Sequence, residues 1–405
     1  GFTLGSLVLN GLSPATTGTT TVRLTGGNLT FDGPTPSIAL NGRSSTGVLA
    51  YDIANNIAFN ANTTISGTGN ASFTLSGVLS GTGTITKLGA STLQLSGNSS
   101  STFSGGIVIG GGGGGGVTVN GNLGGRLPSN QSVVFTGGGG AFVQSGGSGT
   151  IGAVEFRAGA GSVQGTFSGN TTLVLASVSV AQGASGKFTY SGGSPGSTNI
   201  IRIANQGVGY LPTSLTIATG PAYYTTGSGT AGFVNSVTYG TTPNSAALSG
   251  TQTTLGANTG KYLQYTATST ASQVLTGTSG ATQVTVATPG NFSVGGIVAG
   301  SNVPAFTYVT AISGSTLTLS KAITGANPSV TAYTGVSAQT TDSIASLRFS
   351  GNGGSVLLGA SQTLTISSGG LYATGNNSTS GQVIAGGSGI TTGGTTPLYN
   401  FSDSA

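Results

Sequence analysis

The sequence contains no cysteine, methionine, tryptophan or histidine, and only 4% of its residues are charged. Without cysteine the chain forms no disulfide, and without histidine it has no Ser-His-Asp triad. The absence of both also excludes the usual zinc and haem sites, so we expect no metal and no cofactor. The five acidic residues are too few for the recurrent aspartates of calcium-binding nonapeptide repeats.

Positive charge is also sparse. Ten lysine and arginine residues exceed the acidic ones by five, but they occur singly along the chain. A nucleic-acid surface needs clustered cations, usually with stacking aromatics, so we expect no nucleic-acid partner. No run approaches the roughly 20 apolar residues of a membrane helix, so we expect no membrane insertion by this segment. The first residues do not read as a signal peptide, and we expect any leader to lie outside the sequence.

The chain is rich in glycine and in short runs of apolar residues. It has 77 glycines among 405 residues, and 36% of its residues are hydrophobic. Short Val-, Ile- and Leu-rich segments alternate with glycine-rich turns, which indicates β-strands. Repeated β-branched apolar positions distinguish the chain from a disordered one. The sequence therefore predicts an all-β fold.

The clearest repeat runs from Phe73 to Gly110. Phe73, Leu75 and Gly77 recur as Leu93, Leu95 and Gly97, 20 residues later. A period of about 20 with alternating apolar residues is typical of a β-solenoid, in which each coil covers the next. We expect roughly 14 to 16 coils, stacked about 4.8 Å apart.

A second repeat at the same shift precedes it. In residues 1–60, the shift of 20 predicts a stacked ladder of aligned pairs on neighbouring coils. The predicted ladder places Phe31 over Tyr51, Asp32 over Asp52, and Arg23 over Arg43. The two arginines would then balance the two aspartates.

Residues 81–112 resemble the autotransporter-associated β-strand repeat, also called the passenger-associated repeat, of secreted bacterial surface proteins. Ser91 and Phe103 depart from the family pattern, which prefers Gly and Tyr there. The resemblance implies a right-handed parallel β-helix exported to the cell surface. The matching residues are Gly81, Gly83, Ile85, Lys87, Gly89, Leu93, Leu95, Gly97, Asn98, Phe103, Gly105 and Gly106.

Changes in the 20-residue repeat along the chain predict three segments. Residues 1–274 form a β-solenoid with an irregular, Tyr- and Pro-rich section at about 186–260. Residues 275–335 form an inserted module, because TQVTVAT, TYVTAIS and STLTLSK alternate with period 2, as antiparallel hairpins do. Residues 336–405 continue the solenoid and end in a tail. The expected fold is thus a right-handed parallel β-helix carrying a small antiparallel β-module.

Candidate catalytic residues are few. Asp32 and Asp52 are the one pair of acids whose spacing predicts proximity, and paired carboxylates are what glycoside hydrolysis requires. A solvated pair balanced by Arg23 and Arg43 is the preferred interpretation. We therefore expect no enzyme, and a polysaccharide-active enzyme ranks only third among the hypotheses.

The preferred hypothesis is a structural extracellular protein, a self-assembling subunit of a bacterial surface filament, sheath or layer. Solenoid ends expose strand edges that can pair with the next subunit, so the expected partner is a second copy. The alternative is a cell-surface adhesin that binds host or glycan. For either role, Tyr223 and Tyr224 are the candidate adhesive or interface aromatics, because aromatic rings bind sugar faces.

Overall fold

The computed structural model describes residues 1–10, 19–41, 48–67, 72–97, 101–111, 115–218, 220–226, 231–249, 255, 258–270, 272–338, 342–374 and 381–402. It is all-β. Parallel coils stack into a β-solenoid of about 14 turns, and a small antiparallel sheet accompanies them. The predicted solenoid with its antiparallel module is confirmed. The chain divides into two compact units, Gly1–Ser236 and Val237–Ala405, so the boundary predicted at residue 274 lies inside the second unit.

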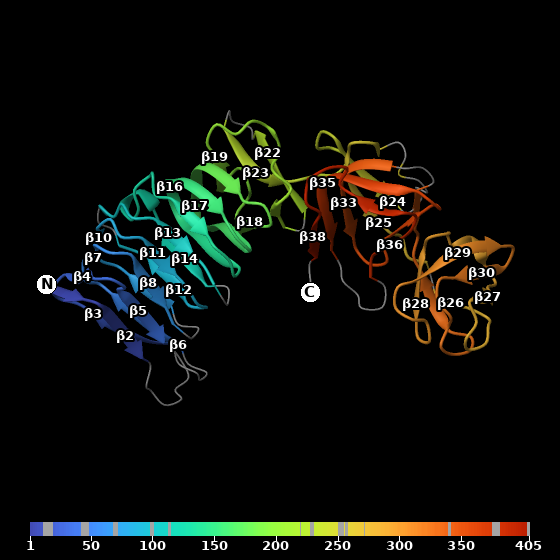
Figure 1. Ribbon diagram of the computed structural model, residues 1–405, viewed down its shortest axis with the longest axis horizontal. Coiled ribbons are helices and arrows are strands. Elements are labelled where there is room, and N and C mark those ends of the chain that lie inside the picture. The colour runs from blue at the N-terminus through green and yellow to red at the C-terminus, as the bar shows by residue number, and fades with distance from the viewer. Residues whose placement is uncertain are drawn as a thin grey trace. The chain divides into compact units, whose positions relative to one another are not determined.

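Unit 1 contains the blue to yellow-green strands of Figure 1. A short 3-10 helix, η1 (Leu123–Gly125), lies between two of its coils. The strands are β1 (Phe2–Leu4), β2 (Ser6–Asn10), β3 (Thr19–Leu24), β4 (Leu29–Phe31), β5 (Ser37–Asn41), β6 (Val48–Ile53), β7 (Ile57–Phe59), β8 (Thr63–Ser66), β9 (Ser72–Leu75), β10 (Leu79–Ser80), β11 (Ile85–Lys87), β12 (Thr92–Leu95), β13 (Ile107–Ile109), β14 (Gly116–Asn120), β15 (Val133–Phe135), β16 (Gly140–Phe156), β17 (Ala160–Val180), β18 (Ser185–Ser191), β19 (Asn199–Ile203), β20 (Gly209–Tyr210), β21 (Leu215–Ile217), β22 (Gly220–Thr226) and β23 (Gly232–Ser236).

The first four coils of unit 1 each contribute three strands. One parallel stack is β1-β4-β7-β10, the second is β2-β5-β8-β11, and the third is β3-β6-β9-β12. The first stack stops at β10. The other two continue through β13 and β14 into the long strands β16 and β17, which turn a corner and take part in both.

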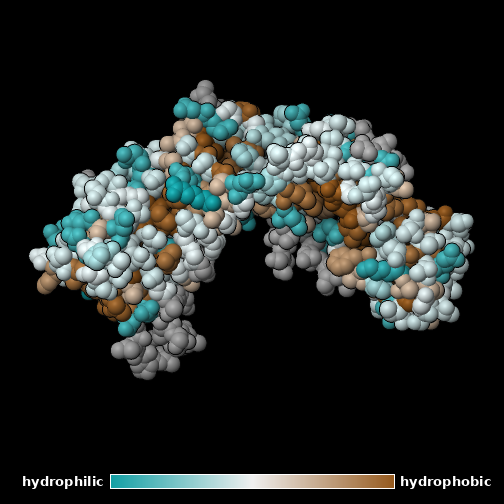
Figure 2. Space-filling model, in the orientation of Figure 1, coloured by the Kyte–Doolittle hydropathy of each residue, from teal (hydrophilic) through white to brown (hydrophobic). Residues whose placement is uncertain are grey.

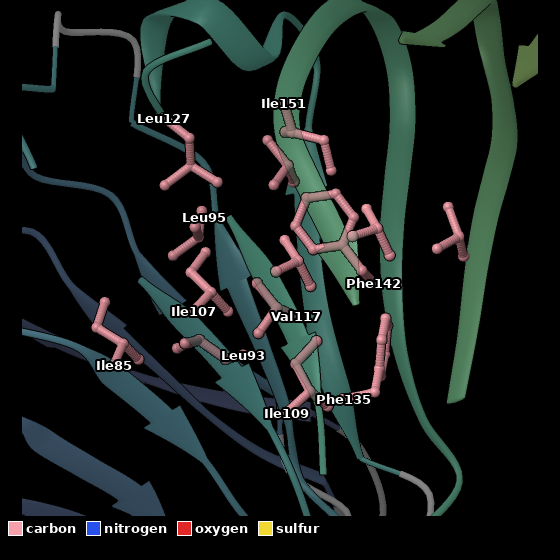
Figure 3. Packing of buried hydrophobic residues seen from close by; sticks show 14 of the residues in the cluster. Ile85, Leu93, Leu95, Ile107, Ile109, Val117, Leu127, Phe135, Phe142 and Ile151 are labelled. Carbon is pink, nitrogen blue, oxygen red and sulfur yellow. The ribbon is translucent and has the colours of Figure 1, made fainter. Parts of the chain in front are cut away.

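Inward-facing apolar side chains fill the coils. Along β11, Ile85 points inward while its neighbour Thr86 points outward, as the period of 2 in a strand requires. Figure 3 shows Ile85, Leu93, Ile107 and Val117 from successive coils converging on one core. Each of these four is at most 1% exposed. Burying such a side chain contributes about 1.5–3 kcal/mol, so the stacked core is the main source of stability.

The Phe73 repeat has the predicted register. Leu93 pairs with Phe73 and Leu95 with Leu75, 20 residues earlier in each case. Gly77 lies where the backbones of adjacent coils nearly touch. A Cβ on Gly77 would lie 2.0 Å from the carbonyl oxygen of the coil below, so only glycine fits there.

An antiparallel hairpin closes the last coil of unit 1. β21 pairs antiparallel with β22, and β22 with β23. Val234 of the hairpin is fully buried in the solenoid core. The Tyr190 hydroxyl donates to the carbonyl of Val234 at 2.6 Å, and Arg202 Nε donates to that of Gly232 at 3.1 Å. The section predicted to be irregular contains the coil strands β18, β19 and β21, then the antiparallel pairings of β22 with β20 and β23, and finally Ser245–Ser249, a strand of unit 2.

Unit 2 contains the remaining strands and the 3-10 helix η3 (Pro289–Asn291). The strands are β24 (Ser245–Ser249), β25 (Tyr262–Thr266), β26 (Gln273–Val274), β27 (Gln283–Thr285), β28 (Ile297–Gly300), β29 (Thr307–Ser313), β30 (Thr316–Leu319), β31 (Ser329–Ala332), β32 (Val336–Ala338), β33 (Asp342–Ser350), β34 (Ser355–Leu358), β35 (Thr363–Ala373), β36 (Val383–Gly386), β37 (Gly389–Thr391) and β38 (Tyr399–Ser402).

The module interrupts the coils of unit 2. β24, β25, β33 and β35 stack in parallel, β37 and β38 both pair with β35, and β32, β34 and β36 form a second parallel stack. β25 pairs directly with β33, although the whole module lies between them in the sequence. The module sheet has the antiparallel order β26-β31-β28-β29-β30-β27 and a separate apolar core.

Candidate functional site

The predicted aromatic ladder exists, but its partners differ from those of the 20-residue shift. Phe31 lies over Phe59, with ring centroids 5.7 Å apart and planes inclined by 18°. Tyr51 lies over Phe73, with centroids 5.6 Å apart and planes inclined by 9°. The predicted contact of Phe31 with Tyr51 is wrong, because the two belong to different stacks, β4 and β6. Phe31 and Phe59 stand 28 positions apart in the sequence, so the coil is longer than the repeat suggested.

The predicted charged ladder is partly different as well. Arg23 faces Asp52 across β3 and β6, and Arg23 Nε lies 3.2 Å from Asp52 Oδ2. Asp32 lies after β4, where its Oδ1 accepts a hydrogen bond from the N–H of Gly33 at 2.8 Å. The register therefore separates Asp32 from Asp52, and the predicted carboxylate pair is wrong. Arg43 lies outside the described residues.

The tyrosines proposed for adhesion are buried. Tyr223 is 7% exposed and packs edge-to-face on Tyr210, with centroids 5.0 Å apart. Tyr224 is 3% exposed, and its hydroxyl donates to the carbonyl of Ile203 at 2.8 Å. Burial raises the pKa of the Tyr224 phenol. Both rings belong to the cap hairpin of unit 1, so the prediction that they meet a ligand or a second subunit is wrong.

Buried polar donors occupy the corners of the coils. Their side chains point inward and donate hydrogen bonds to main-chain carbonyls of glycine turns, groups that burial would otherwise leave unpaired. The amide donors and their acceptors are Asn55 to Gly27, Gln131 to Gly105, Gln144 to Gly121 and Gly146, and Asn199 to Gly165 and Gly192. These side chains hold the turns in place and offer no reactive group to solvent.

Lys87 is the charged member of this set. Its side chain is 1% exposed, and its ammonium donates to the carbonyls of Leu88 at 2.6 Å and Gly89 at 3.4 Å. Burial lowers the pKa of Lys87 to about 8. The sequence did carry a signal for this burial, because Lys87 stands two positions after the inward-facing Ile85 and so on the same side of the strand.

The outer surface of one stack of unit 1 is a ladder of polar side chains. Successive rungs pair directly across neighbouring parallel strands, which lie about 4.8 Å apart. Beyond its second rung the ladder carries no charge and consists mainly of hydroxyl and amide groups. From the first coil onward, its rungs are Arg23, Asp52, Thr74, Gln94, Thr118, Val143, Gln164 and Thr189. Such a face can form neutral hydrogen bonds in a regular array.

The first and last coils have strand edges that pair with nothing in the described part of the chain. β1, β2 and β3 pair only with β4, β5 and β6. Here Phe2 is 66%, Val8 53% and Val22 41% exposed. In the last coil, β36 pairs only with β34, and β37 and β38 only with β35. Ile390 and Leu398 nearby are 37% and 47% exposed. Free edges next to exposed apolar side chains are typical places for strand addition.

A small hollow, but no metal-binding cluster, is found among the described residues. Within the ranges given above, no group of three His, Cys, Asp or Glu side chains could hold a metal ion. A hollow of about 10 Å³, bordered by Leu75, Leu95 and Arg126, has room for about one water molecule. Among the described helices, none is long and apolar enough to cross a membrane.

Comparisons with protein-family models, with curated proteins and with solved structures find no match to this chain.

Proposed function

We propose that this chain is a structural subunit of a bacterial extracellular filament, sheath or surface layer, and that it assembles through its end coils. The observation that carries the proposal is the first coil of unit 1. A further parallel coil placed there would satisfy the free N–H and C=O groups of β1, β2 and β3 and would cover Phe2, Val8 and Val22. The last coil of a second copy has three strands that could meet them, β36, β37 and β38, each paired on one side within the described residues.

The scarcity of charge supports the same proposal. Figure 2 shows a surface that is mostly pale, the colour of intermediate hydropathy, with separate teal and brown areas. Only ten basic and five acidic residues occur in 405. A surface with little net charge favours association, because few like charges repel one another. The outer polar ladder would then allow coils of neighbouring copies to pack side by side.

A bacterial cell-surface location is part of the proposal. It is supported by the resemblance of residues 81–112 to the autotransporter-associated repeat. Twelve positions of the passage match the repeat, with Ser91 and Phe103 departing from its preferred residues, and strands within the passage belong to parallel stacked coils.

Electron microscopy and sedimentation velocity of the purified chain test the assembly. We expect filaments or sheets in the unaltered protein. Val8→Lys and Val22→Lys place a charge beside the free edges and should prevent assembly. Val208→Lys changes another exposed valine, 57% exposed, which lies between β19 and β20 and so outside the first and last coils, and should leave assembly intact. A monomer at all concentrations, or assembly that survives both edge variants, would contradict the proposal.

A second candidate is a cell-surface adhesin. The observation that favours it is a half-exposed aromatic side chain beside the single charged residue of the module, Phe306 beside Lys321.

A further inference from the structure

One loop of the module has a strained backbone. The segment 302–306 connects β28 to β29, and its first and last residues have positive φ angles. These are 62° at Asn302 and 59° at Phe306. Asparagine visits this region readily, but a bulky aromatic residue does so only when its surroundings enforce it. Such outliers concentrate at sites where proteins bind ligands.

The surroundings of the loop supply that constraint. The Thr307 hydroxyl, on a fully buried residue, donates to the carbonyl of Pro304 at 2.6 Å. The ammonium of Lys321 donates to the carbonyl of Ala305 at 2.7 Å. The N–H of Thr324 donates to the carbonyl at position 302 at 2.8 Å. The loop is therefore organised before any ligand arrives, which lowers the entropy lost on binding.

Phe306 is held with part of its ring in solvent. The residue is 44% exposed, the largest value among the aromatics of the module, whose residues 275–335 are all described. One ring edge rests on Gly381, where an added Cβ would lie 2.4 Å from Cε1. Lys321 Nζ lies 5.9 Å from the ring centroid, and Lys321 is the single charged residue between positions 273 and 332.

We propose that Phe306 and Lys321 form a binding site for a sugar that carries a carboxylate, as repeated along an acidic polysaccharide. The exposed part of the ring accepts the apolar face of a pyranose. The ammonium has three N–H donors, and after its bond to Ala305 it retains two for the carboxylate. No acidic residue in the module opposes a polyanion. Because a single shallow subsite binds weakly, a polymer with many equal units is the fitting ligand.

Affinity electrophoresis in gels containing polygalacturonate or polysialic acid tests the site. We expect at least one polymer to retard the protein and fully methyl-esterified pectin, which lacks the charge, not to do so. Lys321→Gln and Phe306→Ala should each weaken binding about tenfold, whereas Lys321→Arg should retain most of it. The matched controls are Lys187→Gln, an exposed lysine of unit 1, and Phe167→Ala, an aromatic that is 41% exposed.

The other possible results also test the proposal. Absence of retardation by both polymers overturns the proposal, and so does an equal loss in Lys187→Gln, because charge alone would then explain binding. Gly381→Ala retains both side chains but displaces the ring, and should weaken binding without removing a charge. The proposal does not depend on self-assembly. Lys321→Gln should still form the assemblies seen by electron microscopy, which distinguishes failure here from failure of the structural role.

Discussion

The parallel coils of unit 1 and the antiparallel module of unit 2 use similar residues but set their strand pairing differently. In unit 1, Leu93 pairs with Phe73, 20 positions away, while Phe59 pairs with Phe31, 28 positions away. In the module, β29 and β30 are joined by a tight turn at Gly314. Coil pairing thus depends on the length of every intervening loop, whereas hairpin pairing depends on one turn.

Glycines at close backbone approaches and glycines in open turns should tolerate replacement differently. In the coils, glycine allows backbones to approach, as at Gly77 and Gly83, where an added Cβ would lie 2.0 and 2.1 Å from a carbonyl oxygen. The module has both kinds: an added Cβ on Gly300 would lie 2.2 Å from the carbonyl oxygen of Ser329, whereas Gly290 has nothing within 4 Å. In the coils, loop length therefore varies from one turn to the next, and some corners leave no room for a side chain. This comparison yields three predictions.

The largest effect is expected from removing a core aromatic of the coils. Phe156 is 1% exposed and stacks on Phe135 with centroids 4.8 Å apart. Phe156→Ala should destabilise unit 1 by about 3–5 kcal/mol. Leu317→Ala, at a fully buried position of the module, should cost about 2–5 kcal/mol there. Hydrogen-exchange mass spectrometry in urea reports opening region by region.

The module has its own apolar core. We therefore expect Phe156→Ala to destabilise unit 1 alone and Leu317→Ala to destabilise the module alone. Phe167→Ala, at an exposed position, should alter stability by less than about 0.5 kcal/mol. If Leu317→Ala loosened the coils of unit 1 as much as the module, the two regions would form one cooperative body and the comparison would fail.

An intermediate effect is expected at the corners. Gly77→Ala would force a Cβ against the carbonyl of Asn55, and we expect a loss of about 1–3 kcal/mol from overpacking. Gly290→Ala is the matched change in the module and should be within about 0.5 kcal/mol of neutral. The urea midpoints of the two variants measure the difference. Equal midpoints would show that the coils can shift to admit a methyl group.

The smallest effect concerns pH. Burial lowers the pKa of Lys87 to about 8, against 10.5 for the free side chain. Between these values the unfolded chain binds more protons, so the stability of unit 1 should rise with pH. The gain should be about 1–2 kcal/mol from pH 8 to 9.5. It should end above about pH 10, because Lys87 then loses its proton in the unfolded chain as well. Burial also raises the pKa of Tyr190, so ionisation of that tyrosine favours the unfolded chain in the same range.

Urea denaturation at several pH values measures this slope. Lys87→Met should remove it. A variant with the same slope as the unaltered protein would show that another group titrates. The module serves as an internal reference, because its single lysine, Lys321, is exposed.

The sequence predicted strand pairing correctly where the repeat length held between two coils, or where the paired strands were close in the sequence. The Phe73–Leu93 register followed from a repeat of apolar residues and glycine at a shift of 20, and the module followed from alternating residues in short hairpins. The pairing of Phe31 was missed because insertions in loops change coil length without changing the pattern of either strand. When the expected length of one loop is wrong, every strand pair predicted for that coil is assigned to the wrong residues.

The candidate site residues were harder to predict. Tyr223 and Tyr224 could not be placed, since tyrosine is equally suited to a surface and to a buried cap, where the Tyr224 hydroxyl finds a main-chain acceptor. The burial of Lys87 was readable from its alternation with Ile85. The conformation of Phe306 was not, because positive φ at an aromatic residue is a property of its surroundings rather than of its own preference.

The hairpin of β22 and β23 has a consequence for the order of folding. Coils of a solenoid nucleate on their neighbours and propagate along the stack. The antiparallel cap ends that propagation, so β24 and β25 must start a new nucleus. That nucleus remains incomplete until β33 has emerged, because Tyr262 pairs with Ser346, 84 positions later. A chain emerging from its N-terminus would complete unit 1 first and the hairpins of the module next, and would close the coils of unit 2 last.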